Sequence, residues 1–221
     1  FQSEFWSVEK VEVISVVFII GFVSILQAQF TQLELFSGFE KTDFTLLSNY
    51  SINNSNTLGV STLAFFQKFR DKENQVFDEV GVQPTLFWNV SKNIALGPSL
   101  YYNSFGGFSE RLSAKFTLKK SQALLVVIPT VAYSEKKHAS LAEIFAEFQF
   151  HKPLSEKISL RFNGQFLTVW DKFKTHSRSF QQLRLGLSYR GHQFGLGSDF
   201  DQYGPKPIQK FSFGLYYRKT L

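Results

Sequence analysis

Residues 182–190 read Gln-Leu-Arg-Leu-Gly-Leu-Ser-Tyr-Arg, an uninterrupted alternation of polar or small residues with apolar ones. Successive side chains of a β-strand point to opposite faces, so this stretch predicts a strand with one apolar and one polar face. The same period of two appears in residues 211–218, Phe-Ser-Phe-Gly-Leu-Tyr-Tyr-Arg. The C-terminal part of the chain is therefore expected to be antiparallel β structure.

The alternation extends over the rest of the chain from Phe30 onward, and no segment after residue 29 shows a helical period over three turns. We predict a single all-β, antiparallel domain over residues 29–221. Twelve strands fit the pattern best, with ten or fourteen as alternatives. Their expected ranges are 30–39, 43–52, 57–68, 79–90, 93–103, 108–119, 121–134, 138–150, 157–170, 178–190, 193–201 and 208–219.

The composition excludes several classes of protein. The chain has no cysteine, which excludes disulfides, thiolate metal sites and cysteine nucleophiles. The formal net charge of +6 would suit a nucleic-acid partner. The basic residues, however, are divided between expected loops and the polar strand face, and they form no platform with aromatic residues. We therefore expect no nucleic-acid partner.

The only long apolar run, Val13–Ala28, has the short length and the small final residue of a secretory signal peptide. A transmembrane helix needs roughly 20 residues, which is more than this run provides. We predict that residues 1–28 are removed, with cleavage after Ala28 or nearby; an N-terminal anchor helix is the alternative. Residues 1–12 are too acidic for a usual n-region, which leaves open whether residues 1–7 lie upstream of the true start.

Alternation alone suits a soluble barrel as well as a membrane barrel, since each has one apolar face. Three features favour the membrane. Many expected strands exceed the roughly 9–11 residues that a tilted strand needs to cross a bilayer. The polar face carries charges such as Glu34 and Lys115, unlike a protein core. Aromatic residues gather at both strand ends on the apolar face, as in membrane-barrel girdles. The predicted girdle residues include Tyr50, Trp88, Tyr102, Trp170, Tyr189 and Tyr217.

The connections between strands give a further indication. Longer polar segments such as 70–78 and 202–207 alternate with tighter ones such as 53–56 and 191–192. Outer-membrane barrels have short periplasmic turns and longer external loops. We therefore predict an up-and-down transmembrane β-barrel in a bacterial outer membrane. A soluble secreted barrel that binds an apolar ligand is the alternative.

The terminal stretch Phe211–Lys219, the Gln29 that follows the apolar run and the Phe-, Tyr- and Lys-rich composition resemble outer-membrane β-barrel proteins of Bacteroidota. The resemblance covers the whole mature chain but rests on general patterning, without a family signature. It implies insertion by the barrel assembly machinery, with the last strand as the recognition signal. Such signals often end on an aromatic residue, whereas this chain ends Lys219-Thr220-Leu221. Loop lysines are expected to meet outer-membrane lipids and lipopolysaccharide.

The polar strand face predicts a charged lumen. If Gly191 and His192 form a hairpin turn, Arg184 lies opposite Asp199. A turn centred on Leu154 places Glu147 opposite Arg161. We expect these two charge pairs to face the barrel interior. The same reasoning sets Tyr216 across from Gly195 and Phe200 opposite Phe211. Further residues expected to face the lumen are Lys115, Glu143, Arg190, Asp201 and Tyr216.

Two groups of residues have side chains of the types found in catalytic or metal-binding sites. His138 and Ser140 have the His-x-Ser spacing of outer-membrane phospholipase A and lipid A deacylases, but the asparagine that follows the serine there is Leu141 here. We therefore expect His138 to be a polar rim residue. Asp199 and Asp201 share one strand face near the expected outer rim, where we expect an acidic rim without metal, with a cation site as the alternative. The other histidines are scattered singly and form no metal-ligand cluster. We predict no metal, no cofactor and no catalytic residue.

These observations predict a small outer-membrane barrel that forms a narrow polar channel or serves as a structural or accessory barrel. A hydrolase that acts on outer-membrane lipids is the catalytic alternative. The sequence does not distinguish an open lumen from one filled by its own side chains.

Overall fold

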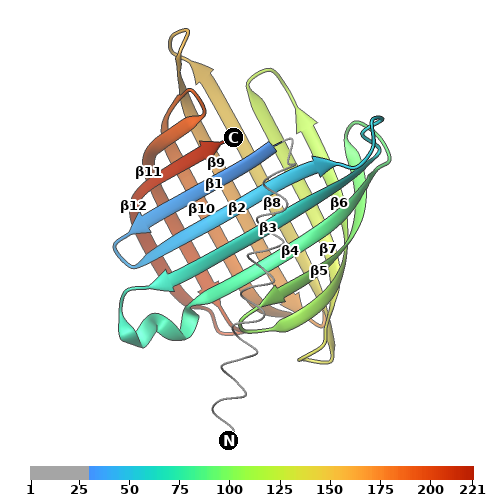
Figure 1. Cartoon of the computed structure of the whole chain (residues 1–221). Coiled ribbons are helices and arrows are strands. Elements are labelled where there is room, and N and C mark those ends of the chain that lie inside the picture. The colour runs from blue at the N-terminus through green and yellow to red at the C-terminus, as the bar shows by residue number, and fades with distance from the viewer. Residues whose placement is uncertain (1–29) are drawn as a thin grey trace, which may run out of the picture.

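The computed structural model describes residues 30–221, so the predicted signal peptide and its cleavage point lie outside the described residues. Twelve antiparallel strands close into a barrel in sequence order, with β1 paired to β12 (Figure 1). The predicted fold class and strand number are confirmed. The strands are β1 (Phe30–Gly38), β2 (Lys41–Ser51), β3 (Leu58–Phe69), β4 (Glu79–Asn89), β5 (Ile94–Asn103), β6 (Gly107–Lys119), β7 (Ala123–Ser134), β8 (Ala139–Pro153), β9 (Ile158–Asp171), β10 (Thr175–Tyr189), β11 (His192–Tyr203) and β12 (Ile208–Thr220).

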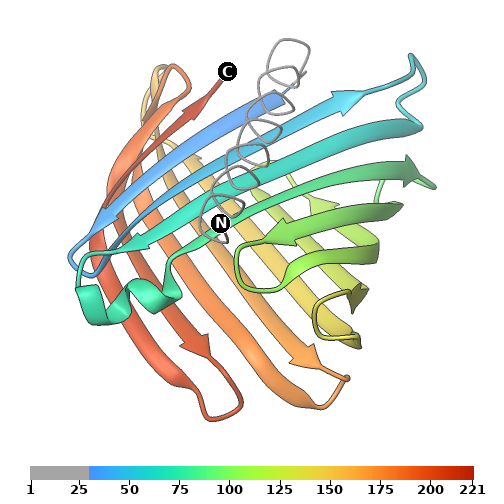
Figure 2. The ribbon, with the colours of Figure 1, turned by 60° about the horizontal axis from the view of Figure 1, so that its bottom comes forward.

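The barrel has two distinct ends. We call the end that holds Phe30 and Leu221 the terminus end, at the top of Figure 1, and the opposite end the loop end. The loop end carries the 3-10 helix η1 (Lys72–Phe77), visible at the lower left of Figures 1 and 2. Within residues 30–221, no helix is long and apolar enough to cross a membrane.

The predicted contrast between long and short connections is wrong for most of the barrel. Only the segment 70–78 is much longer than those at the terminus end. The loop-end segments are 39–40, 70–78, 104–106, 135–138, 172–174 and 204–207, and the terminus-end segments are 52–57, 90–93, 120–122, 154–157 and 190–191.

The outer face of the barrel is apolar and the inner face is polar. On β10, Leu183, Leu185 and Leu187 are exposed on the outside, while Arg184 and Ser188 at alternate positions are buried inside. This arrangement is the reverse of a soluble barrel, whose apolar side chains fill the interior. An exposed apolar surface around a whole barrel indicates contact with lipid.

Aromatic side chains lie on the outer face near both ends. At the terminus end, Tyr50, Trp88, Tyr189 and Tyr217 are exposed. At the loop end, Tyr102 packs against Phe108 of the neighbouring strand, with the ring centroids 5.0 Å apart and the rings tilted by 53°. Neighbouring pairs continue this belt: Phe44 lies on Phe66 at 5.7 Å, and Phe39 lies against Phe211 at 6.3 Å. Trp170 occupies the same face at the loop end of β9.

Inward-facing glycines allow large side chains to pack close to the wall between β10 and β1. Gly195 lies across from Tyr216, and Phe200 lies across from Phe211, in the register that the sequence predicted. A Cβ atom on Gly186 would come within 2.7 Å of the Tyr216 hydroxyl. A Cβ atom on Gly197 would come within 2.9 Å of the Phe36 ring. Here glycine provides the space that an aromatic ring fills.

Candidate functional site: the charged lumen

On one side of the barrel, the lumen contains a lysine that is surrounded by carboxylates. Lys41 Nζ of β2 lies 3.0 Å from Asp43, 3.1 Å from Asp199 and 2.7 Å from Asp201. It also donates a hydrogen bond of 2.9 Å to Gln67 Oε1. The Lys41 and Asp199 side chains are almost fully buried, at 1% and 0% exposed. Because an isolated buried charge is costly, each of these groups depends on the others.

Two arginines extend the cluster toward the terminus end. Arg184 Nη1 lies 2.5 Å from Asp199 Oδ1, and Arg184 Nε donates to Glu34 Oε1 at 2.9 Å. Arg218 of β12 binds the second oxygen of Glu34, at 2.5 Å from Nη2. The Arg184 guanidinium also lies over the Phe36 ring at 4.4 Å from its centroid. Glu34 thus links the two arginines.

A further ion pair crosses the lumen. Arg178 of β10 pairs with Glu79 of β4, and these strands lie on opposite sides of the closed strand order. Tyr203 of β11 accepts a hydrogen bond of 2.8 Å from Gln67 Nε2 of β3. The nine charged residues joined in this way are called the lumen network below. They are Glu34, Lys41, Asp43, Glu79, Arg178, Arg184, Asp199, Asp201 and Arg218.

The end of η1 packs onto the loop end of this network. Phe77 stacks on Tyr203 with ring centroids 4.5 Å apart, and Phe77 also contacts Phe69 at 6.0 Å. Lys210 of β12 donates a hydrogen bond of 2.6 Å to Asn74 Oδ1. The segment 70–78 therefore covers the mouth of the lumen beside β3, β11 and β12.

Little space is left within the lumen network. The void beside it measures about 10 Å³, which is room for about one water molecule. Its lining residues are Glu34, Asn163, Gln165, Gln182, Arg184 and Arg218. The side chains of Lys41, Arg184, Asp199 and Arg218 are at most 4% exposed, so side chains fill the lumen on the side of β10, β11, β12, β1 and β2.

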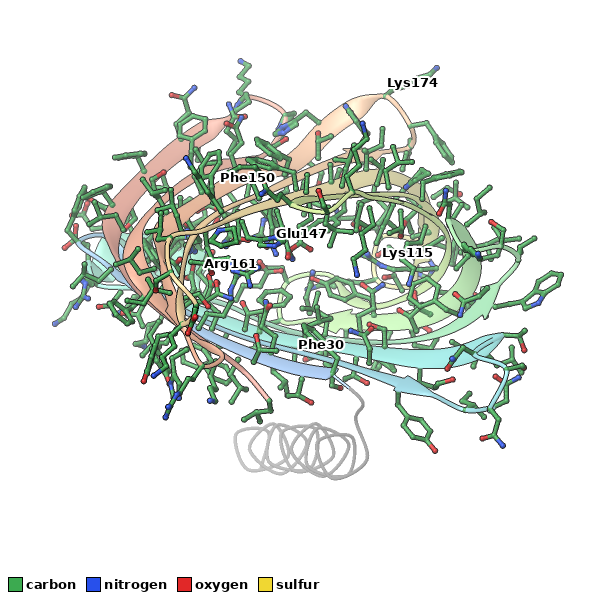
Figure 3. The ribbon with its side chains drawn as sticks, turned by 90° about the horizontal axis from the view of Figure 1, so that it is seen from above. Phe30, Lys115, Glu147, Phe150, Arg161 and Lys174 are labelled. Atoms are coloured by element: carbon green, nitrogen blue, oxygen red, sulfur yellow. The ribbon has the colours of Figure 1, made fainter. Side chains whose placement is uncertain are left out.

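The opposite side of the lumen has fewer ion pairs. Arg111 of β6 binds Glu143 of β8 at 3.0 Å and lies over the Tyr101 ring at 3.9 Å from its centroid. Lys115, Glu147 and Arg161 also point into the lumen in the view from the terminus end (Figure 3). All three are only partly buried. In the part of the chain that the structure describes, none of them has an ion-pair partner within 4.0 Å.

The predicted register of the β10–β11 hairpin is wrong by two residues. The turn is formed by Arg190 and Gly191, both with positive φ of 48° and 78°, which is the requirement of a type I′ turn. Arg184 therefore lies opposite Gly197, and Asp199 lies opposite Gln182. A shift of two keeps every side chain on its face. Arg184 and Asp199 consequently still meet, along a diagonal rather than directly across.

The predicted pairing of Glu147 with Arg161 is wrong. Glu147 lies opposite Gln165, and Arg161 lies opposite His151. The reason is that β8 continues to Pro153, beyond its expected end at residue 150, so that the turn is centred closer to β9 than Leu154. Glu147 instead accepts a hydrogen bond of 2.7 Å from Gln149 Nε2. Both residues face the lumen without meeting.

Two further placements differ from the sequence predictions. Arg190 does not face the lumen: it lies in the β10–β11 turn, exposed, with its guanidinium 5.2 Å from the Tyr189 ring centroid. Asp199 and Asp201 do not form an acidic rim, because they are buried inside and bound to Lys41. The ammonium group takes the place that a cation would need there. Tyr216 and Glu143 face inward, as described above.

The candidate His-x-Ser pair is not assembled. His138 has a positive φ of 46° and ends the segment 135–138, whereas Ser140 lies on β8 and is exposed on the outer face. Among residues 30–221 no hydrogen bond joins the two side chains, and no group of three or more histidine, aspartate or glutamate side chains could hold a metal ion.

Sequence reasoning missed four members of the lumen network: Lys41, Asp43, Glu79 and Arg178. The sequence nevertheless contained a spacing that could have indicated some of them. Lys41 and Asp43 stand two residues apart, like Asp199 and Asp201, and so share a strand face. Lys41 and Glu79 are the first residues of their strands, and Arg178 lies close to the start of β10. At the start of a strand few alternating residues precede the charge, so the charge is easily assigned to the loop. Only the closed barrel shows that Arg178 and Glu79 meet across the lumen.

Comparison with solved structures shows a shared fold. The chain is similar to the NanC porin, with a TM-score of 0.52 and 8% sequence identity, over 86% of this chain and 98% of that one. The KdgM porin in complex with disordered oligogalacturonate has a TM-score of 0.47 and 8% identity, over 86% of this chain and 98% of that one. An outer-membrane channel from Pseudomonas putida F1 has a TM-score of 0.45 and 11% identity, over 87% and 93%. No protein-family model and no curated protein matches the sequence. The likeness to the NanC porin shows that the two chains share a β-barrel fold.

Proposed function

We propose that the protein is an integral outer-membrane barrel whose narrow, charged lumen passes small polar solutes. The observation that carries the proposal is the distribution of side chains in a closed twelve-strand barrel. Charged and amide groups face inward, and leucine, phenylalanine and other apolar residues are exposed outward. This is the distribution that a pore across a lipid bilayer requires.

The route that supports passage lies away from the lumen network. The network fills the lumen beside β10, β11, β12, β1 and β2, so solutes have to follow the wall formed by β5 to β9. Lys115, Glu147 and Arg161 lie along this wall and are partly exposed. A route confined to one side of a twelve-strand barrel suits small polar molecules and ions rather than folded or bulky ones.

Single-channel recording in planar bilayers tests the proposal. The folded, purified protein is expected to give small, stable conductance steps. The same protein unfolded by heat in the same detergent serves as the control. Heat-modifiable migration on gels establishes that the sample is a folded barrel before the recording. A folded sample that gives no steps would contradict passage of ions.

A second candidate function is a closed structural barrel, and one observation favours it. The Arg178–Glu79 pair bridges opposite walls, and Glu79 is 1% exposed. A lumen crossed by a buried ion pair is suited to rigidity. In this case the folded protein gives no conductance, and a variant without the bridge gives it.

We also propose two partners. The resemblance to Bacteroidota outer-membrane proteins supports export through the predicted signal peptide and insertion by the barrel assembly machinery through β12. The basic residues of the expected loops all lie in or beside segments of the loop end, which supports contact between their lysines and lipopolysaccharide. These residues are Lys68, Arg70, Lys72, Lys136, Lys137, Lys172 and Lys174.

Two measurements test these partners. N-terminal sequencing of protein from outer membranes is expected to begin near Gln29, and retention of Val13–Ala28 would contradict export with cleavage. Neutralising Lys72, Lys172 and Lys174 together is expected to weaken binding to lipopolysaccharide micelles. The matched control neutralises Lys92, Lys120 and Lys157, which lie in terminus-end segments.

A further inference from the structure

A cavity of about 230 Å³ lies at the terminus end, between the β2–β3 hairpin, β4 and β6. Phe30 and Lys115, which both line it, lie at opposite sides of the lumen mouth in Figure 3. The lumen network contributes no residue to its lining. We call it the mouth cavity. Its lining includes Phe30, Asn49, Phe87, Asn89 and Lys115.

Lys115 brings an unpaired positive charge to the mouth cavity. Its register partner on β5 is Ala95, and its ammonium lies 4.1 Å from the centroid of the Phe87 ring. Within residues 30–221 no carboxylate lies within 4.0 Å of Lys115 Nζ. A partly buried ammonium beside apolar groups has lost water without gaining a counter-charge. It therefore attracts an anion more strongly than an exposed lysine does.

Amide groups add hydrogen-bonding capacity around this charge. The Asn49 side chain makes no hydrogen bond with any described residue. Asn89 donates from Nδ2 to the backbone oxygen of Asn56 at 2.6 Å, which orients its amide. An Asn amide donates two hydrogen bonds and accepts two, so Asn49 is able to bind an oxygen of a ligand.

The size and lining of the mouth cavity limit the ligand. A cavity of about 150 Å³ binds benzene, so about 230 Å³ accommodates a benzene ring with one small substituent. Phe30 and Phe87 offer ring surfaces that favour an aromatic ligand. A single unpaired ammonium balances one negative charge, which matches a carboxylate better than a phosphate, whose charge at neutral pH is closer to two.

From these observations we propose that the mouth cavity binds a small aromatic carboxylate, with the carboxylate at Lys115 and the ring against the apolar lining. Binding rests on the folded barrel of the proposed function but does not require that solutes pass through it. A failure of conductance and a failure of binding are therefore separate results.

Isothermal titration calorimetry of the folded protein in detergent tests the proposal, with benzoate as the probe. Benzamide keeps the ring without the charge, and acetate keeps the charge without the ring. We expect saturable binding of benzoate, and affinities on the order of tenfold or more weaker for benzamide and acetate. Absence of benzoate binding, or equal affinity for acetate, would overturn the proposal.

Two lysine variants locate the site. Lys115→Met keeps most of the length of the side chain but removes its charge, and it is expected to weaken benzoate binding on the order of tenfold or more. Lys119→Met is the matched control, because Lys119 follows on the same face of β6 but is exposed. It is expected to bind benzoate as the unmodified protein does. Heat-modifiable migration shows that both variants fold. Unchanged binding by Lys115→Met would place the ligand elsewhere and contradict the proposal.

Discussion

The two sides of the lumen use the same residue types in opposite ways. Beside β10, β11, β12, β1 and β2, lysine, arginine and carboxylate groups form one connected network, and most of these side chains are almost completely buried. Beside β6, β8 and β9, Lys115, Glu147 and Arg161 face the same lumen without an ion-pair partner among the described residues. The difference lies in the neighbours of each charge rather than in its type.

This difference indicates separate roles for the two sides. A charge held by several partners in a dry site has little freedom to bind a solute, and its loss exposes the partners to an unfavourable environment. A charge without a partner contributes little to folding and is free to act on whatever enters the lumen. The folded barrel therefore depends on the lumen network remaining intact, and in the proposed channel the opposite wall is the side that meets solutes.

The largest expected effect is from Lys41→Met. It leaves Asp43, Asp199 and Asp201 close together without their shared cation. Breaking a buried ion pair by removing one partner costs about 3–5 kcal/mol. We expect a loss of free energy of unfolding of that size, measured by urea titration of the barrel in detergent or lipid vesicles. The matched control is Lys72→Met on exposed η1, which should change the free energy of unfolding little. Equal effects of the two variants would show that the network is not a stabilising unit.

A smaller loss of stability is expected from Gly195→Ala on the network side. A Cβ atom at this position would lie 2.1 Å from the Leu185 carbonyl oxygen and 2.5 Å from Gly186 Cα, which are backbone atoms. Relief of this clash requires movement of β10 against β11, and overpacking of this kind typically costs about 1–3 kcal/mol. The control is Gly106→Ala, whose Cβ would meet only the Asn103 side chain, at 3.0 Å. Urea titration is expected to show little change for the control.

The sequence was sufficient to predict the barrel because the signal is repeated along every strand. Leu183, Leu185 and Leu187 each add to the same inference, so an error at one residue does not change the result. Register has no such repetition. Moving the turn by one residue from Gly191-His192 to Arg190-Gly191 shifted every partner by two, and the alternation pattern is unchanged by that shift.

For the candidate site, the sequence predicted which strand face lines the lumen but not which charged residues form ion pairs there. Arg184 and Asp199 were assigned to the lumen from alternation, but their partners Glu34 and Lys41 come from strands more than 140 residues earlier. Contacts across a barrel depend on closure and on which rotamers fill the interior. Neither property is encoded in the local period of a single strand. The absence of an ion-pair partner for Lys115 could not be predicted for the same reason, because it depends on the strands that surround this residue.

A third prediction concerns the Arg178–Glu79 ion pair that crosses the lumen. Replacing both Arg178 and Glu79 by methionine removes both charges, and Asp201, which Arg178 also approaches at 3.9 Å, keeps its ion pair with Lys41. The free energy of unfolding is therefore expected to change by no more than about 1 kcal/mol. Glu79→Met alone leaves Arg178 with only the 3.9 Å contact to Asp201 and is expected to cost more. The double variant should raise the single-channel conductance, since the bridge no longer crosses the lumen. An unchanged conductance would show that this pair does not limit passage.

The smallest expected effect on stability is from Arg161→Glu on the solute-facing wall. Arg161 has no ion-pair partner among the described residues and its Nε has no hydrogen-bond partner, so the free energy of unfolding should change by less than about 0.5 kcal/mol. The ion selectivity of the pore should nevertheless move toward cations, since the substitution replaces a positive charge on the passage wall with a negative one. The reversal potential in a salt gradient measures this shift. Arg184→Glu is the matched comparison: its charge change is identical, but it breaks the buried contacts with Asp199 and Glu34. It should therefore lower stability strongly. If Arg184→Glu instead shifts selectivity as much as Arg161→Glu and leaves stability unchanged, the two sides of the lumen do not have separate roles.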